Sequence, residues 1–347
     1  MRHHRVLRAR LFIAFGCALF LAPGFIYAQS ADVTYVEGSV DLQPSGQDRT
    51  EAMIGDSLNP GDSIITGSDG IADLQKQDQS QITVSPGTVF TIRQISQGGQ
   101  KRDVLALALG SISFKFNQVV GTEPLISTAS AAAGIRGTEL TVYAGSDGSS
   151  LFVVKSGKVD VTSAGQTVDL TQSEGVQVSP GQAPGAKFKV LAGFENFSSW
   201  NAGKVKAMLD DPVAAAERVE QQMSYYEKEI AVLEPEYAKN TEALTAARAK
   251  LKDVQQTQGK DAGQRYYTDN VFPLEKQGVA LFLNIRYYAL SAFSLKRFVL
   301  GRMYLDLTTR YITDPGNAMY TQFLNTYNRV VTTFDATVVP HLVAADI

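Results

Sequence analysis

The feature that most constrains this chain is a change of hydrophobic periodicity near residue 195. Before it, apolar and polar residues alternate in short runs that Gly, Pro, Asp or Ser interrupt. A period of two in Val, Ile, Thr and Phe is typical of β-strands. After it, glycine becomes rare and apolar residues recur every three or four positions, as in α-helices. The sequence therefore predicts an α+β protein with two segregated domains, all-β first and long helices second.

The β-rich part also contains a weak repeat. Gly38, Gly110 and Gly157 each precede apolar residues at alternate positions, and glycine permits a tight turn there. The spacings of 72 and 47 residues are uneven, which favours coiled or stacked strands, a β-solenoid-like arrangement, over a regular propeller. Strands are expected at residues 33–36, 39–43, 82–84, 89–92, 112–116, 140–143, 151–154, 159–162 and 168–170.

The helical part begins with a strong start signal and then keeps a heptad. Asp211 is a good N-cap, and Pro212 suits the first helical position. Pro235 interrupts the pattern without changing its register, so we expect a kink and not a break. Twelve positions, all apolar except Asn240, predict a long helix that packs along one seam, and Asn240 is expected to fix the pairing. They are Ala216, Val219, Met223, Tyr226, Ile230, Leu233, Tyr237, Asn240, Leu244, Ala247, Leu251 and Val254.

Two further helices complete the predicted antiparallel bundle, which spans residues 212–340. One occupies residues 266–311, and the other starts near Met319 and ends at Pro340. The expected core face of the 266–311 helix is Phe272, Val279, Leu283, Leu290, Phe293, Leu300, Tyr304 and Leu307, and Leu281, Phe282, Tyr288 and Leu295 widen it. The expected core face of the last helix is Met319, Phe323, Tyr327, Val330 and Phe334.

Four basic residues on the 266–311 helix argue against a membrane span. Arg286, Lys296, Arg297 and Arg302 recur too often for a segment in hydrocarbon. We interpret them as a solvated or snorkelling stripe; binding of an acidic partner is the alternative.

Residues 1–28 have the pattern of a signal peptide. Four arginines precede an apolar run from residue 11 to residue 27, and Ala28 is a small residue for cleavage. The alternative is an uncleaved membrane anchor, because seventeen apolar residues approach the length of a membrane span. In that case the protein would associate with the membrane through this segment. Cleavage removes the four arginines and takes the formal net charge from −3 to −7. The sequence therefore predicts a periplasmic, mildly acidic protein with no basic face for nucleic acid.

Few catalytic chemistries are open to the mature chain. Cys17 is the only cysteine and lies in the signal segment, and His341 is the only histidine that follows it. Triads that use His and zinc sites of His and Cys are thereby nearly excluded, and no cofactor or metal motif is visible. Only an enzyme built from carboxylates stays open.

Residues 34–178 resemble the FecR-type domain family. The resemblance follows segments 55–58, 61–70, 72–74, 82–88 and 110–114 in the family's order, and its most specific element is Ile135-Arg136-Gly137-Thr138-Glu139-Leu140. On this basis we expect the FecR-type domain at 32–192, a linker or docking segment at 193–211, and Trp200 packed where the domains meet. The resemblance implies a periplasmic coiled-strand module. The family's regulators carry a cytoplasmic helical domain, whereas about ten residues precede the apolar run here, so we expect no control of a sigma factor by this polypeptide.

The expected function is non-enzymatic. We predict a protein–protein interaction scaffold or envelope signalling adaptor that contacts other envelope proteins, with homo-oligomerisation through the helices as a further option. A glycan-binding module is the alternative, which exposed aromatic residues on the β part would favour. A carboxylate hydrolase is the third, which two facing acids in a deep cleft would favour.

Two motifs of the β part admit both structural and functional interpretations. Gly134, Arg136, Gly137, Thr138 and Glu139 are predicted to form a structural turn in which Arg136 satisfies carbonyls or pairs with an acid, although a partner contact is the alternative. Four aspartates of the β part form a second set, for which turns are the expected role, because Asp after Gly is typical of turns, and calcium binding is the alternative. These are Asp56, Asp62, Asp69 and Asp73.

Overall fold

The computed structural model describes residues 31–97, 100–116, 124–190 and 197–343, so the predicted signal segment and Cys17 lie outside it. The β part contains one 15-stranded sheet. Its strands are β1 (Ala31–Glu37), β2 (Val40–Gln43), β3 (Thr50–Glu51), β4 (Ser57–Leu58), β5 (Ser63–Thr66), β6 (Ile71–Gln75), β7 (Gln81–Val84), β8 (Val89–Gln97), β9 (Gln100–Lys115), β10 (Leu125–Ser127), β11 (Ala132–Ala144), β12 (Ser150–Ser163), β13 (Gln166–Leu170), β14 (Glu174–Val178) and β15 (Phe188–Lys189). Every expected strand lies in one of these.

The sheet curls into a small closed barrel. β9 pairs with both β10 and β11, and β10 pairs with β11, so these strands form a closed circuit. Residues at alternate positions point inward and bury large side chains such as Phe90, Phe114 and Phe152.

The β-solenoid-like expectation is not what the described strands form. A solenoid stacks parallel strands, whereas β10 with β9 is the one parallel pair among the described pairings. Gly110 and Gly157 have positive φ angles in the middle of β9 and β12. The repeat therefore marks bends inside long strands, and this explains why its spacing is uneven.

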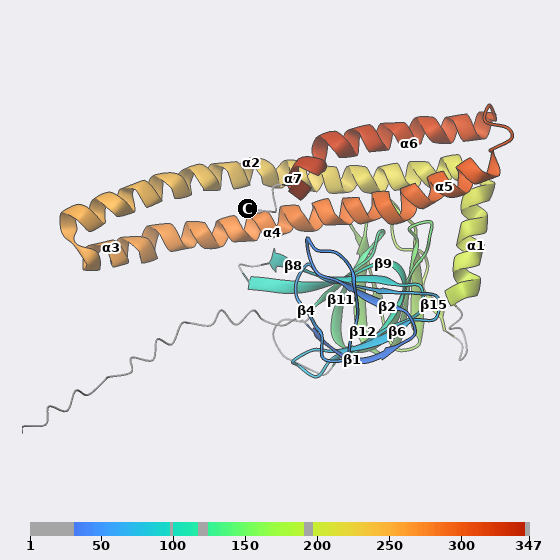
Figure 1. The fold of residues 1–347 in the computed structure, drawn as a ribbon, viewed down its shortest axis with the longest axis horizontal. Coiled ribbons are helices and arrows are strands. Elements are labelled where there is room, and N and C mark those ends of the chain that lie inside the picture. Colours follow the sequence, from blue (N-terminus) through green and yellow to red (C-terminus); the bar gives the residue numbers. More distant parts are fainter. Residues whose placement is uncertain (1–30, 98–99, 117–123, 191–196, 344–347) are drawn as a thin grey trace, which may run out of the picture.

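The second half consists of helices whose long axes run roughly together (Figure 1). α2 and the tract from α3 to α5 form an antiparallel hairpin, and α6 packs along α2. The tract includes two π-helical turns, η1 and η2. The bounds are α1 (Phe197–Asp210), α2 (Pro212–Gln258), α3 (Lys260–Tyr266), η1 (Tyr267–Val271), α4 (Phe272–Ser294), η2 (Leu295–Leu300), α5 (Gly301–Arg310), α6 (Ala318–Thr337) and α7 (Val339–Val343).

The predicted seam of α2 is confirmed. All twelve of its positions are buried or half-buried, and Asp211 caps the helix by accepting the Ala214 N–H at 3.1 Å. α2 runs through Pro235 without a break. At the other end of the bundle, α6 ends at Thr337, and Pro340 lies inside the short helix α7 instead of stopping a longer one.

The predicted core face of the 266–311 helix is correct only in part: Leu283, Leu290 and Tyr304 are half-buried, and Leu281 and Leu295 of its widened part are buried. Phe272, Val279 and Phe293 are exposed, whereas Leu300 and Leu307 are buried as expected. A π-helical turn adds a residue to a turn and rotates the following side chains, and η2 lies between the two regions. The observed core residues are Leu281, Ile285, Ala289, Ala292, Leu295, Val299, Leu300, Met303 and Leu307.

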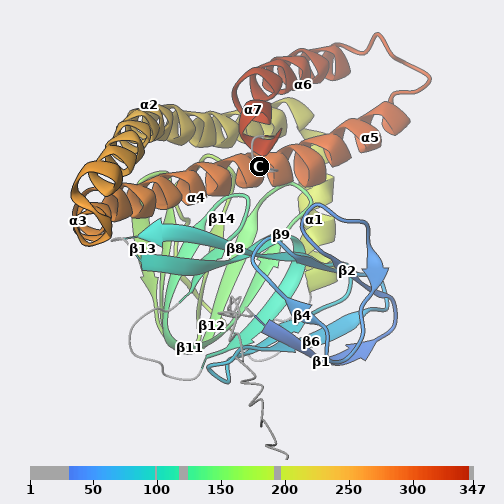
Figure 2. The same ribbon diagram turned by 60° about the vertical axis from the view of Figure 1, so that its left-hand side comes forward.

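The helical hairpin lies across one end of the barrel, and two views show the same arrangement (Figures 1 and 2). Each half has its own hydrophobic core, and Ala129 is the one residue of the β part in the helical core. Trp200 of α1 packs beside Tyr143, and its Nε1 donates to Gln177 Oε1 at 3.2 Å. Helix α1 is thus packed against the barrel through Trp200.

Candidate functional site

The hairpin is fastened to the barrel by polar contacts from the middle of its two helices. Tyr226 Oη of α2 donates to the Ala129 carbonyl at 3.1 Å, in a buried position. Asn284 Oδ1 of α4 accepts the Ser96 N–H at 2.9 Å. Tyr287 Oη and Ser127 Oγ are 2.9 Å apart. These hydrogen bonds, one buried and two part-buried, join the two halves.

A groove of about 560 Å³ lies beside these contacts, between the barrel and the hairpin. Hydroxyl side chains line its barrel side, and tyrosines and amides line its helical side. Its named contributors are Thr128, Ser130, Thr162 and Ser163 from the barrel, and Gln221, Gln222, Tyr225, Tyr226, Glu229, Asn284, Tyr287 and Tyr288 from the helices.

The four tyrosines of the groove form one aromatic cluster. The ring centroids of Tyr287 and Tyr288 are 5.1 Å apart, and those of Tyr225 and Tyr288 are 6.2 Å apart with the rings nearly perpendicular. Burial raises the pKa of Tyr226, Tyr288 and, to a lesser extent, Tyr225, so their hydroxyls stay protonated at neutral pH. The cluster offers flat apolar faces together with hydrogen-bond donors.

The groove does not provide paired acids for hydrolysis. Among the described residues that line it, Glu229 is the one carboxylate. A hydrolase built from carboxylates needs a second acid across the substrate. The groove is therefore suited to binding through aromatic and polar contacts.

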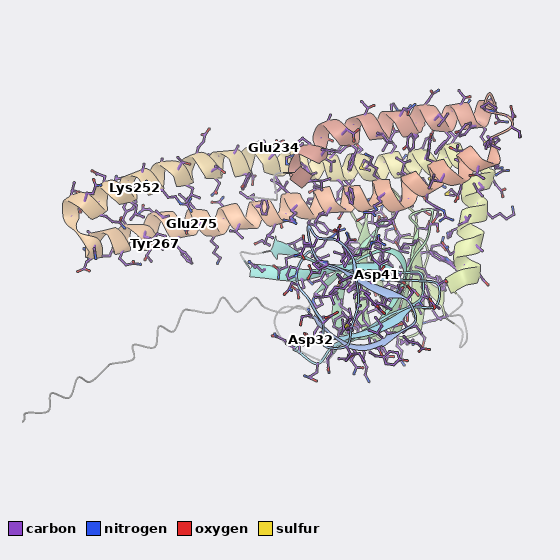
Figure 3. The ribbon with its side chains drawn as sticks, viewed as in Figure 1. Asp32, Asp41, Glu234, Lys252, Tyr267 and Glu275 are labelled. Atoms are coloured by element: carbon purple, nitrogen blue, oxygen red, sulfur yellow. The ribbon has the colours of Figure 1, made fainter. Side chains whose placement is uncertain are left out.

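A second candidate surface is the distal arm, which we define as residues 232–280 of α2, α3, η1 and α4. It extends past the barrel, beyond the contacts made by Tyr226 and Asn284 (Figure 3). Near its end Glu275 accepts hydrogen bonds from Arg248 at 2.7 Å and from Tyr267 at 2.9 Å. The hydrogen bonds from Arg248 and Tyr267 lower the pKa of Glu275. These bonds tie the two helices of the arm together.

The arm exposes apolar side chains on one stripe of α4. Phe272 is 52% exposed and Val279 is 47% exposed, and seven residues separate them, which places them on the same face of the helix. Val232 of α2 is also exposed on the arm, at 64%. Exposed apolar residues that recur at helical spacing mark a surface that can pack against another helix.

The four basic residues of the 266–311 helix divide into two pairs. Lys296 Nζ is 3.1 Å from Asp335 Oδ1, and Arg302 Nε is 3.1 Å from Asp306 Oδ2. Arg286 and Arg297 instead line a cavity at the barrel. The interpretation as a simple solvated stripe holds only for part of it.

The motif at residues 134–139 lies inside strand β11 and not in a turn between strands. The register of β11 against β12 shifts between Arg136 and Glu139, which marks a β-bulge, and Gly137 has a φ of 55°. Thr138 Oγ1 donates to the Lys158 carbonyl at 2.9 Å. Gly134 has an ordinary backbone. The side chain of Arg136 lies outside what the structure describes, so its structural role stays a prediction.

Of the four aspartates, Asp56, Asp62 and Asp69 accept backbone N–H groups in turns and loops, whereas Asp73 of β6 accepts from the paired strand β7. Asp62 accepts the N–H groups of Ser45 and Asn59, each at 2.8 Å. Asp56 accepts the Met53 N–H at 2.8 Å, Asp69 accepts the Ser39 N–H at 3.4 Å, and Asp73 accepts the Thr83 hydroxyl at 2.6 Å. Within the described ranges no group of three potential metal ligands comes together.

Sequence reasoning missed the groove, although it left a signal. Tyr226 and Tyr288 were assigned to helix faces, and each adjoins a second tyrosine. Adjacent residues on a helix lie about 100° apart, so a Tyr-Tyr pair cannot fit wholly within one seam. Two such pairs indicate an aromatic surface at the edge of the core.

One described helix, Lys260–Arg310, is long and apolar enough to cross a membrane by length and composition. It packs against α2 and β8 here, and the core helix of a bundle passes the same test.

Part of the chain is similar to a known protein family and to solved structures. Residues 62–160 match the family model described as FecR protein, and the helical half lies outside the match. No curated protein matches the chain. Two crystal structures of a candidate anti-sigma factor from Parabacteroides distasonis are similar to part of it. The first has 18% identity, a TM-score of 0.33, and coverage of 38% of this chain and 60% of its own length. The second has 18% identity, a TM-score of 0.32, and coverage of 46% and 73%.

Proposed function

Because residues 62–160 are a FecR domain, we propose that this protein is an exported, periplasmic interaction module of envelope signalling. FecR-family proteins are typically non-enzymatic and act through contacts with other proteins. The observation that carries the proposal is the distal arm, which extends past the barrel (Figure 3) and exposes Phe272 and Val279. The barrel and the arm can therefore engage two envelope proteins at once.

The arm has the properties that a helical docking surface needs. Arg248, Glu275 and Tyr267 fix its end, so little conformational entropy remains to be lost on binding. Lys276, an exposed residue four positions after Phe272 and three before Val279, lies between them on the same face and adds the charge that keeps the free protein soluble. A partner that presents a helix with an apolar stripe fits this surface, and a second copy of the arm fits it too.

Introducing charge into the apolar stripe of the arm tests the proposal. We expect Phe272→Lys combined with Val279→Lys to leave the thermal melt unchanged, because both residues are exposed, and to lose the envelope partner in affinity purification. Lys252→Glu, an exposed position on α2 of the same arm, is the matched control and should retain it. Equal partner recovery in the two variants would remove the arm from the function.

Export is tested by the processed N-terminus. We expect the mature chain to begin at Gln29, since Ala28 is the predicted cleavage residue. Recovery of an intact Met1 in the membrane fraction would favour the anchored alternative.

The groove favours a second candidate function, binding of an envelope glycan. Sugars are commonly bound by aromatic faces with adjacent hydroxyl and amide groups, and the groove combines Tyr225 and Tyr288 with Asn284. The feature first expected for this function is weak, because Tyr35 is the one aromatic side chain among the described β residues that is clearly exposed. Tyr288→Ala should weaken glycan binding and leave capture by the arm intact.

A further inference from the structure

A buried arginine at the boundary of the two halves has no acidic partner. Arg93 of β8 is 7% exposed. Its Nη1 donates to Ser291 Oγ at 3.2 Å and its Nη2 to Ser294 Oγ at 2.7 Å, both on α4. Its Nε is buried and has no hydrogen-bond partner among the described residues. The two serine hydroxyls donate in turn to carbonyls of their own helix, so they accept from Arg93 and carry no negative charge.

An uncompensated buried guanidinium is costly. A hydroxyl or a water satisfies a donor, but neither neutralises the charge, and an unpaired buried charge costs several kcal/mol. Burial lowers the pKa of Arg93 to about 10, and the nearby Arg286 acts in the same direction. The group still carries its charge at neutral pH. Such a cost is usually offset by an anion.

A cavity of about 180 Å³ opens beside Arg93, and further arginines line it. Arg286 and Arg297 reach it from the helices, and Arg49 reaches it from the barrel. Arg286 Nη2 is 3.5 Å from Ser45 Oγ, and Arg297 stacks near Phe298 with 5.3 Å between its Cζ and the ring centroid. None of these four arginines has an ion pair among the described residues.

The described lining of the cavity is positively charged. None of the described residues that line it is Asp or Glu. The nearby Asp62 uses one carboxylate oxygen for the Ser45 N–H and the other for the Asn59 N–H. Like charges gathered around a concave surface raise the local concentration of anions.

We propose that this arginine pocket binds a small organic anion headed by a carboxylate or a phosphate group. Guanidinium groups bind both headgroups through paired N–H donors. Leu290 and Phe298 supply an apolar wall for the body of the ligand. The pocket takes residues from β8 and from α4, so a bound anion also strengthens the attachment of the helices to the FecR domain. The site is separate from the arm and does not depend on the partner contacts proposed above.

Calorimetric titration of the purified full chain tests the pocket, with phenyl phosphate and benzoate as probes at constant ionic strength. We expect one saturable site per chain and a higher melting temperature in the presence of the bound probe. Tighter binding of phenyl phosphate assigns the site to phosphates, and tighter binding of benzoate assigns it to carboxylates. Both results support the proposal.

Three variants localise the site. Arg286→Gln and Arg297→Gln should each weaken binding by about tenfold or more, since each removes a charged donor. Arg302→Gln, whose arginine pairs with Asp306 outside the pocket, should bind as the wild type does. The exposed or half-exposed positions of these residues keep the fold intact, unlike a change at Arg93. No saturable binding of either probe, or equal loss in the Arg302 and Arg297 variants, would overturn the proposal.

Discussion

At the residue scale, glycines decide where the barrel can bend. A Cβ on Gly157 would lie 2.5 Å from the Gly137 carbonyl oxygen, and Gly157 has a φ of 86°. Gly137, in the bulge of β11, thus faces Gly157 of β12 at close range. The sequence indicated both glycines as backbone devices, through the repeat and through the Arg136-Gly137-Thr138 motif. It could not indicate that they meet, because the register of two long strands is a tertiary property.

We expect Gly157→Ala to lower the free energy of unfolding by about 2–4 kcal/mol, from strain at positive φ plus the clash with the backbone. Gly165→Ala is the matched control. Gly165 also has a positive φ, of 73°, but nothing lies within 4 Å of the added methyl group. It should cost only about 1–2 kcal/mol. Chemical denaturation of both variants gives the comparison, and equal losses would show that the close approach contributes nothing.

Glu174 gives the barrel a defined response to acid. Its carboxylate accepts the Thr171 N–H at 2.8 Å and the Thr171 hydroxyl at 2.9 Å, and Lys189 lies 3.2 Å away. The hydrogen bonds from Thr171 are the main cause that lowers the pKa of Glu174 to about 2. A lowered pKa in the folded state means that the stabilisation is complete above pH 4.5 and is lost as the pH falls towards 2.

We therefore expect Glu174→Gln to melt at a lower temperature than the wild type at pH 7, with a difference that shrinks between pH 4.5 and pH 2. Glu51→Gln, at an exposed position of β3, should match the wild type throughout. A difference for Glu174→Gln that stays constant down to pH 2 would contradict the role of the charge.

At the scale of elements, the two helices of the hairpin show what periodicity can and cannot predict. The apolar residues of α2 recur mostly along one line, with exposed exceptions such as Val232, so its seam followed directly from the sequence. α4 has apolar residues on nearly all sides, and the turn η2 changes the register in its course. Periodicity could not choose among these faces. Close packing selects the small residues Ala289 and Ala292 for the interior and leaves Phe272 outside.

Asn240 was expected to fix the pairing of the long helix. Asn240 is buried, at 5% exposure, opposite Gly278. A Cβ added at Gly278 would lie 2.8 Å from Asn240 Oδ1. Neither polar atom of its side chain has a hydrogen-bond partner among the described residues. A buried amide without hydrogen-bond partners lowers the free energy of unfolding, so Asn240 would fix the helix pairing at the expense of stability.

We expect Asn240→Ala to raise the free energy of unfolding by about 1 kcal/mol, because the removed amide has no hydrogen bonds to lose. Asn284→Ala is the contrast. Its Oδ1 accepts the Ser96 N–H, so its loss should lower stability by about 1–3 kcal/mol. Urea denaturation reports both values. Destabilisation by Asn240→Ala would mean that its amide is satisfied in solution.

At the scale of the whole molecule, the division into a β half and a helical half was predictable from the change in period near residue 195. The mutual orientation of the halves was not. It depends on contacts such as Tyr226 with Ala129, which join positions 97 residues apart in the chain. The groove and the arginine pocket arise from this orientation, so neither could be assigned from the sequence.

The separate cores predict that the β half folds alone. We expect residues 30–193 to give a β-type circular dichroism spectrum and a cooperative melt, because one core lies entirely within them. The melting temperature should be lower than that of the full chain, since Ala129 and Arg93 lose their helical contacts. A disordered fragment would contradict the two-domain organisation.

Photo-cross-linking in the living envelope tests most directly whether the distal arm contacts an envelope protein. A photoreactive amino acid is placed at Val279 and, as control, at Lys252. We expect a discrete cross-linked product between the protein and an envelope partner from position 279, which is lost on Phe272→Lys. We expect no such product from position 252. Identical products from both positions, or cross-links confined to cytoplasmic proteins, would contradict it.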